Sequence, residues 1–455
     1  MKFRRKGVIA LTAALCMALF ASAAMAALDE AGLRTAVKSD GAVVKLDQDI
    51  ELTTGALEVK GVSVTIDLNG WTLSRTSNKD DNTYVIEVSN NATLTINDSK
   101  GNGTILSTND TEEGLARGIR IGGESFSDDD STPGTVIMNG GKISANTGYG
   151  VALYANNRGK SEGNYEDEIA TVFTMTGGKI EAGVYGVAAF GRKATVNIQG
   201  GEIAAEDGAA VSGNGQDGDN NSGGTEINIS GGKLESKNSV AIYHPQDGVL
   251  NVSDGEITGV DGIQMKAGTL VVNGGVITGE GTKGAIGSSD GNDETGAAVS
   301  IISVGGESGS YAGDINATFN GGTLISKQEN AIFEAQADGA VTKFESLTIT
   351  GGTFTAPDGE DVISMTETNV TNENGNSNVN ITGGTFSSDP NECQGMENAN
   401  IAEGTLDENG NYVISAPAPA PAPSAPQHSG GGGCSAGFGA LALLAVVPLL
   451  RMRKR

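Results

Sequence analysis

The segment Val196-Asn-Ile-Gln-Gly-Gly-Glu-Ile203 contains the eight-residue pattern that decides the fold of this chain. Apolar and polar residues alternate before a pair of glycines, and a further apolar residue follows the pair after one intervening position. Eight related segments occur elsewhere in the chain, with aspartate in place of the first glycine in one of them; they begin at Val136, Phe173, Ile227, Leu250, Leu270, Ala317, Leu347 and Val379. Recurrence of this kind indicates a repeat architecture in which each copy forms one structural unit.

The pattern within each unit indicates short strands. Alternation with period two is typical of a β-strand, and the glycine pair favours a bend where the strand ends. Most units carry a second apolar stretch, for example Gly150-Val-Ala-Leu-Tyr154 or Gly186-Val-Ala-Ala-Phe190. One unit cannot bury its own apolar face, whereas stacked units can. The chain is therefore predicted to be all-β, a single parallel β-helix (β-solenoid) of roughly a dozen coils.

Stacking of the units predicts columns of equivalent residues. The inward column is expected to contain Met138, Met175, Ile198, Ile229, Val252, Val272, Phe319, Ile349 and Ile381. In the column that follows the glycine pair, Glu202 is expected to lie between Lys179 and Lys233, with coils roughly 4.8 Å apart. We interpret this charged column as structural support of roughly 0.2–1 kcal/mol per favourable pair, and not as a ligand-binding stripe.

Both ends of the chain contain targeting signals. A basic start, an apolar run and Ala24-Met25-Ala26 predict a signal peptide that signal peptidase cleaves between Ala26 and Ala27. An Ala/Pro-rich stretch near the other end predicts a semi-rigid linker. The expected organisation is signal peptide 1–26, N-terminal cap helix 27–40, parallel β-helix with loop insertions 41–390, C-terminal cap 391–415, Ala/Pro/Gly linker 416–433 and sorting or anchor segment 434–455.

The C-terminal segment consists of small residues, an apolar run and a basic tail. The stretch Gly430-Gly-Gly-Gly-Cys434-Ser-Ala-Gly-Phe-Gly-Ala-Leu-Ala-Leu-Leu444 resembles the Synerg-CTERM class of bacterial sorting signals, and the resemblance covers residues 429–455. It implies a diderm bacterium, processing near Gly433 and Cys434 by a sortase-like or rhomboid-like membrane protease, and display on the outer cell surface. The alternative is a permanent membrane anchor, with the basic tail in the cytoplasm.

Two further stretches resemble β-helix proteins. The amphipathic segment from Leu28 to Lys38 and the strand-like stretches that follow it resemble the first coils of the pectate-lyase-like superfamily. This resemblance implies a right-handed parallel β-helix whose first coil is plugged by a helix. The stretch from Phe386 to Ile414 resembles the closing segment of repetitive bacterial surface β-helix proteins, which implies a terminal cap around Cys393.

The composition limits the classes of partner. Of the 29 Lys and Arg residues in the chain, eight lie in the two terminal targeting segments, which leaves 21 against 56 acidic residues in the body. A surface with a net charge of −35 repels nucleic acid, so we expect no nucleic-acid partner. The body has a single cysteine, Cys393, and therefore no disulfide framework.

The pectate-lyase-like superfamily includes polysaccharide lyases and glycosidases, so catalysis has to be considered. Asp80 and Asp81, Arg117 and Arg120, and the run Asp128-Asp129-Asp130 form the best group of candidate catalytic residues, and His244 is a weaker candidate base. Aspartate runs flanked by Ser and Gly are commonly solvated loops, so we assign no catalytic residue. A carbohydrate-active enzyme of this superfamily remains the alternative hypothesis.

Two kinds of binding site are considered as well. Asp217, Asp219, Asp290 and Asp293 offer clustered oxygen ligands of the kind that calcium uses, the alternative being flexible polar insertions, and we expect no other cofactor. Tyr154 and Phe190 fall at equivalent positions of neighbouring units and could form an aromatic platform for a glycan. The function we predict is that of an exported cell-surface protein, structural or adhesin-like and non-catalytic, with a glycan or a surface protein as its partner.

Overall fold

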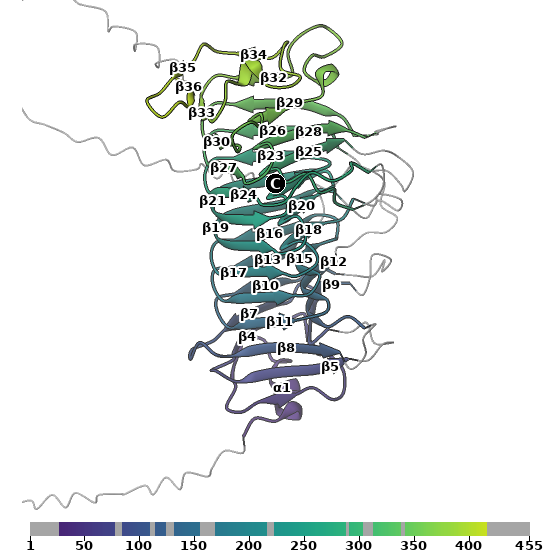
Figure 1. Cartoon of the computed structure of the whole chain (residues 1–455). Helices are drawn as coiled ribbons and strands as arrows, with labels where there is room; N and C mark the ends of the chain where they lie inside the picture. The colour runs from purple at the N-terminus through teal and green to yellow at the C-terminus, as the bar shows by residue number, and fades with distance from the viewer. Residues whose placement is uncertain are drawn as a thin grey trace, which may run out of the picture. The chain divides into compact units, whose positions relative to one another are not determined.

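The computed structural model describes residues 27–77, 84–109, 114–123, 132–154, 169–215, 223–287, 291–303, 313–337 and 342–415. These residues form one compact unit in which coils stack on one another (Figure 1). Their strands lie in a 25-stranded sheet and an 11-stranded sheet, and strands of successive coils pair in parallel. The prediction of an all-β parallel β-helix is therefore confirmed.

Each complete coil consists of three strands. The first strands, which precede the glycine corner, are β1 (Ala42–Lys45), β4 (Ser63–Asp67), β7 (Thr93–Asn97), β10 (Thr135–Met138), β13 (Thr171–Met175), β16 (Ala194–Ile198), β23 (Thr269–Val272), β26 (Ile315–Phe319), β29 (Phe344–Ile349), β32 (Val379–Ile381) and β34 (Asn400–Ile401). The second strands are β2 (Ile50–Glu51), β5 (Thr72–Ser77), β8 (Thr104–Asn109), β11 (Lys142–Ala145), β14 (Lys179–Ala182), β17 (Glu202–Ala205), β24 (Val276–Gly279), β27 (Thr323–Ser326), β30 (Thr353–Thr355) and β33 (Gly384–Phe386). In β19 (Thr225–Ser236) and β21 (Gly248–Gly259) the first and second strands are continuous through the corner.

The third strand of each coil belongs to the 11-stranded sheet. Its members are β3 (Leu57–Lys60), β6 (Ile86–Ser89), β9 (Arg117–Gly122), β12 (Tyr149–Tyr154), β15 (Tyr185–Ala189), β18 (Val211–Gly213), β20 (Ile242–His244), β22 (Ile263–Met265), β25 (Val299–Ser303), β28 (Ile332–Gln336) and β31 (Ile363–Ser364). These strands are the second apolar stretches of the sequence repeat. Both faces of several of them are buried, because loops and side chains cover the outer face of this sheet.

The core is a stack of inward-pointing side chains. The predicted inward column from Met138 to Ile381 is buried at every position, and the residues before and after each of its members are more exposed. Towards the C-terminal coils Phe319 of this column meets Phe354 of β30 edge-on, and Phe354 stacks on Phe386 of β33. The ring centroids of Phe319 and Phe354 are 5.7 Å apart, and those of Phe354 and Phe386 are 4.9 Å apart. Burial of one apolar layer per coil is what holds the stack together.

The glycine pairs are required by the geometry of the corner. The second glycine of the pair has a positive φ, +90° at Gly178 and +88° at both Gly201 and Gly232. A Cβ atom on Gly201 would lie 2.7 Å from the carbonyl oxygen of Gly178, and one on Gly232 would lie 2.9 Å from that of Gly201. Glycine thus permits both the turn and the close stacking of one corner on the next.

Both ends of the stack are covered. Helix α1 (Glu30–Ala36) is N-capped by Asp29, whose side chain accepts a hydrogen bond from the Gly32 amide at 2.8 Å, and Leu33 and Val37 are buried against the first coil. At the other end β36 (Tyr412–Ile414) pairs antiparallel with β33 and with β35 (Thr405–Leu406), which ends the parallel pairing. The 3₁₀ turns η1 (Glu367–Asn369) and η2 (Pro390–Glu392) precede it, and Cys393 is a buried free thiol. These elements cover edges that would otherwise pair with other chains.

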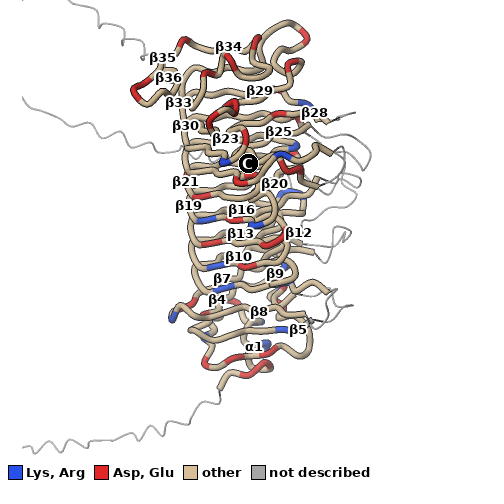
Figure 2. Tube along the Cα trace, in the orientation of Figure 1, with Lys and Arg blue, Asp and Glu red and all other residues tan. Residues whose placement is uncertain are grey.

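Polar ladders follow the outer surface of the stack. The Asn228 amide donates to the Asn197 side chain of the preceding coil at 3.0 Å, and it accepts from the Asn251 amide of the next coil at 2.9 Å. The predicted position of Glu202 between Lys179 and Lys233 is confirmed by the strand register. Figure 2 shows acidic and basic residues at successive levels of the coil stack.

Candidate functional site

An aromatic–arginine cluster covers part of the outer face of the 11-stranded sheet. It consists of Tyr84, Arg117, Arg120, Tyr149, Tyr154, Tyr185 and Phe190, which lie on or beside β6, β9, β12 and β15. The alanines Ala152 and Ala188 lie beneath it. The cluster brings together residues that the sequence offered separately, as candidate catalytic groups and as a candidate glycan platform.

The rings of the cluster pack mainly on one another. The Phe190 ring meets Tyr149 and Tyr154 edge-on, with centroid separations of 5.8 and 6.2 Å, and Tyr149 lies beside Tyr185 at 5.3 Å. The exposed fractions of Tyr154 and Phe190 are only 7 % and 8 %. Tyr149 and Tyr185 are half-buried and are the more accessible members. Sequence reasoning missed these two, although both precede a glycine at equivalent positions of the repeat, Tyr149-Gly150 and Tyr185-Gly186.

The two arginines of the cluster contact rings and a carboxylate. The guanidinium carbon of Arg117 lies 5.6 Å from the ring centroid of Tyr84 and 5.5 Å from that of Tyr149, within the range of cation–π attraction. The Arg120 guanidinium pairs with the Glu87 carboxylate at 2.8 Å, and both side chains are largely buried. Burial raises the pKa of Glu87, which the Arg120 charge partly opposes. The other members of the candidate catalytic group, Asp80, Asp81 and Asp128 to Asp130, lie outside the described residues.

A buried polar network occupies the same sheet further along the stack. We call the described residues 280–287 and 291–298 the strap, because this network holds them against β22 and β25. The Asp261 carboxylate accepts hydrogen bonds from the Thr295 and Gly296 amides, each at 2.8 Å, and burial raises its pKa. The Gln264 side chain bonds both the amide and the carbonyl of Asp293. These contacts occupy polar groups on the outer face of β22 that would otherwise be buried without partners.

Asp293 is engaged by a buried lysine. Its Oδ2 atom lies 2.7 Å from the Lys266 Nζ, and its Oδ1 accepts from the Gly287 amide at 2.7 Å. An ammonium group beside this carboxylate repels a second cation, so this environment does not support the prediction of a calcium ligand at Asp293. Asp217, Asp219 and Asp290, the other calcium candidates, lie outside the described residues. Within the described ranges no three acidic, histidine or cysteine side chains converge as a metal site.

Two further titratable groups lie inside the stack. His244 is fully buried and faces the core from β20, its Nδ1 lies 3.0 Å from the Ala267 carbonyl oxygen, and burial lowers its pKa to about 4. The buried Glu334 carboxylate accepts hydrogen bonds from the Thr366 amide at 2.8 Å and from the Asn369 amide group at 2.7 Å, and burial raises its pKa. His244 points into the core, while Glu334 holds residues 366–369, which contain η1.

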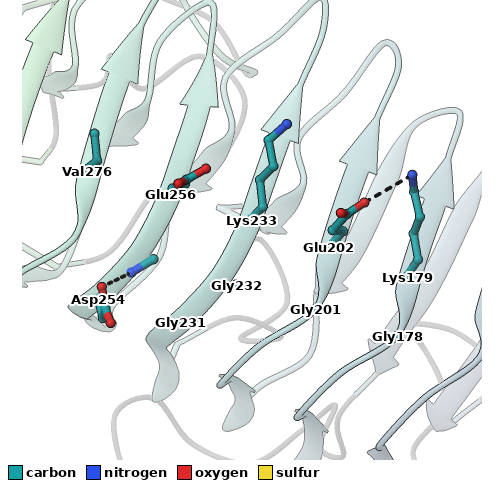
Figure 3. A pocket seen from close by; sticks show the side chains of 11 residues that line it. Gly178, Lys179, Gly201, Glu202, Gly231, Gly232, Lys233, Asp254, Glu256 and Val276 are labelled. Atoms are coloured by element: carbon teal, nitrogen blue, oxygen red, sulfur yellow. Dashed lines mark hydrogen bonds and ion pairs between the residues drawn. The ribbon is translucent and has the colours of Figure 1, made fainter.

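A groove of about 840 Å³ runs along the glycine corners of five coils. Figure 3 shows its floor, made of corner glycines and Asp254, and the row of side chains beside it. That row is the charged column Lys179, Glu202, Lys233 and Glu256, followed by Val276. The sequence predicted this column but not the groove, because the hollow depends on the angle at which the two strands of each coil meet.

Comparisons with known proteins add no function. No protein-family model matches the chain, and neither a curated protein sequence nor a solved structure is significantly similar to it. Among the residues that the structure describes, no helix has the length and apolar content that crossing a bilayer requires. The candidate cleavage positions Ala26, Gly433 and Cys434 lie outside those residues, and Ala27 is the first residue within them.

Proposed function

We propose that this chain is an exported cell-surface protein whose coil stack is a non-catalytic, adhesin-like body. Signal peptidase removes residues 1–26, and residues 434–455 direct the protein to the outer surface of a diderm bacterium, where a sortase-like or rhomboid-like protease processes them. A linker at 416–433 separates the stack from the membrane.

One observation carries the non-catalytic part of the proposal. The described residues with the strongest claim to chemistry are engaged with one another: Arg117 contacts two tyrosine rings, Arg120 pairs with Glu87, and the Asp293 carboxylate pairs with Lys266. Catalytic carboxylates and bases need a reacting atom within hydrogen-bonding reach. Groups committed to internal pairs favour a structural use of this surface. The acidic body supports a partner that is a neutral glycan or a surface protein, and excludes nucleic acid.

The test uses residues 27–415, which contain every described strand and the whole described core. The protein is incubated with a panel of neutral and acidic polysaccharides, with and without calcium. Released reducing or unsaturated ends report cleavage, and protein retained on the glycan reports binding. Turnover of any polysaccharide would overturn the non-catalytic function in favour of a carbohydrate-active enzyme.

Retention on a glycan is assigned by substitution. Tyr149→Ala combined with Tyr185→Ala removes the accessible rings of the aromatic–arginine cluster, while Thr174→Ala combined with Thr195→Ala is a matched double change on another outer face. Loss of retention only in the tyrosine variant identifies the cluster as the glycan site. Export is tested with the full chain in a diderm host, where protease added to intact cells should digest the body, and a protected body contradicts surface display.

A further inference from the structure

The groove along the glycine corners has a charge pattern that is complementary to itself. Along four successive coils its row of side chains reads Lys179, Glu202, Lys233, Glu256, in the order plus, minus, plus, minus. Val276 continues the row and is 38 % exposed. The floor consists of glycines and of Asp254, which replaces the first glycine of one corner, and it leaves room beside the row (Figure 3). A row of projecting side chains therefore lies next to a hollow of matching length.

The charged residues of the row differ in the ion pairs that they form within the chain. Lys179 pairs with Glu202 and with Glu181, each at 3.2 Å, and Lys233 pairs with Glu235 at 2.6 Å. These side chains are all about half exposed, so their pairs contribute little stability and leave the charges available to a partner. The Glu256 carboxylate has no ion pair or hydrogen bond among the described residues. This end of the row thus carries a carboxylate whose charge acts on Lys233 of the preceding coil without a direct ion pair, and it lies next to the exposed Val276.

We propose that the groove binds the same groove of a second copy of this chain, antiparallel and related by a two-fold axis between Glu202 and Lys233. This inference builds on the proposed adhesin-like function. In this arrangement Lys179 of each copy faces Glu256 of the other, and Glu202 faces Lys233. The two rows face each other, and both copies use the same surface patch, as an isologous interface requires.

The register follows from the order of charges. The two-fold arrangement forms four ion pairs across the interface and brings no like charges of the row together. Moving the axis one coil towards the N-terminus leaves two pairs and places Lys142 against Lys233. In a parallel arrangement without a shift, every charged residue of the row faces the same residue of the other copy. A parallel arrangement shifted by one coil forms three ion pairs but places Lys142 against Lys179. Like-charge contacts cost free energy at an interface, so the antiparallel register is selected.

Neighbouring positions are compatible with this register. On each strand, the next outward residue lies two positions after the charged row. In the two-fold arrangement Glu181 of one copy faces Thr258 of the other and Ala204 faces Glu235, so neither contact joins like charges. At each end the aliphatic stem of Lys142 meets the exposed Val276 of the partner. A second coil stack also has the same spacing of about 4.8 Å between charges, whereas an extended peptide advances about 3.3 Å per residue. The spacing therefore favours a copy of this chain over a linear peptide.

The antiparallel arrangement has a consequence for display on cells. The C-terminal ends of the two stacks point in opposite directions, while proteins anchored to one cell at their C-termini stand parallel. Pairs of this kind therefore join stacks displayed on two facing cells. The high acidic charge opposes close approach, but at about 0.15 M ionic strength charges more than about 8 Å apart are largely screened and contacting pairs are not.

The test exploits the exchange of single charges. Glu202→Lys places Lys against Lys233 of an identical partner, and Lys233→Glu places Glu against Glu202. Each variant should therefore fail to pair with itself, while the mixture of the two restores all four ion pairs. Sedimentation equilibrium of residues 27–415 at concentrations up to about 200 µM and about 0.15 M salt measures association. Glu58→Lys and Lys60→Glu on β3 are matched controls, since Glu58 is 56 % and Lys60 46 % exposed against 55 % for Glu202 and 49 % for Lys233.

We expect a dimer for the wild type and for both controls, at least tenfold weaker association for each groove variant alone, and recovery in the mixture. A monomeric wild type, or groove variants that pair with themselves as the wild type does, would overturn the proposal. A mixture that stays monomeric would overturn the register. This experiment does not depend on export, so its failure leaves the proposed function standing.

Cells that display the full chain test the arrangement between cells. Two fluorescently distinct populations, one with Glu202→Lys and one with Lys233→Glu, should form mixed clusters and no clusters of a single colour. Wild-type cells should cluster with one another. If the purified proteins pair but cells stay dispersed while protease shaving confirms display, pairing between facing cells is excluded.

Discussion

Replacing Lys266 by methionine tests whether the buried network holds the strap in place. Methionine keeps most of the volume of the side chain and removes only its charged end. The Lys266 and Asp293 side chains are 1 % and 8 % exposed, so the change leaves the Asp293 carboxylate buried without its counter-ion. Removing one partner of a buried ion pair commonly costs about 3–5 kcal/mol. The Gly287 amide still donates to Asp293, so we expect the lower part of that range, about 3 kcal/mol.

This cost should appear as local opening of the strap. Hydrogen exchange reports the opening of each segment separately, so it distinguishes the strap from the coils around it, which global unfolding does not. The amides of Gly287, Asp293, Thr295 and Gly296 all donate to side chains of the network. With a tenfold change for each 1.4 kcal/mol, about 3 kcal/mol corresponds to exchange that is roughly a hundredfold faster at these amides.

A second variant separates charge from packing. Lys266→Met combined with Asp293→Asn removes both charges and keeps an oxygen that accepts from the Gly287 amide. We expect this double variant to recover protection to within about 1 kcal/mol of the wild type, since removing both partners leaves no uncompensated charge. Mass spectrometry of deuterated peptides from the strap and from distant coils measures both effects. Unchanged exchange in Lys266→Met would refute the role of the Lys266–Asp293 pair in holding the strap against the sheet.

Three further changes test the coil itself. Gly201→Ala should destabilise the stack by about 2 kcal/mol or more in a urea titration, because the new Cβ would lie 2.7 Å from the Gly178 oxygen. The control is Gly101→Ala, which has a φ of +85° but no atom within 4 Å of the new Cβ, and it should cost about 1 kcal/mol. The pKa of His244 falls from 6.5 to about 4 on folding, so the unfolded chain binds the His244 proton more tightly than the folded chain does. The free energy of unfolding should therefore fall by about 3 kcal/mol between about pH 6.5 and pH 4. Thermal unfolding at the two pH values measures this loss, which His244→Gln should lack. Asn228→Ala breaks hydrogen bonds to both neighbouring coils and should cost about 1–2 kcal/mol by the same titration; a change within error would remove the ladder as a source of stability.

The repeat could be read from sequence because its signals are local. Alternation around Val196 and Ile198 specifies a strand, and the glycine pair after it specifies a corner where a Cβ has no room. Since equivalent residues stack once per coil, the neighbours of Glu202 follow from alignment of the repeats alone. Fold class, the inward column and the charged column were therefore all predictable.

The sites depended on contacts that alignment does not contain. Tyr154 and Phe190 do occupy neighbouring coils, but whether their faces are open is decided by Tyr149, Tyr185 and the side chains that pack around them.

The contacts of the strap could not be predicted from alignment of the repeats either. Asp293 lies in a long insertion between β24 and β25 of one coil, and its position against Lys266 depends on how that insertion folds back over the sheet. The sequence by itself determined the stack, because each coil repeats the same local conformation. Only the tertiary structure decided which charges are buried, which rings are covered and where a groove opens, because these depend on packing between segments of unequal length.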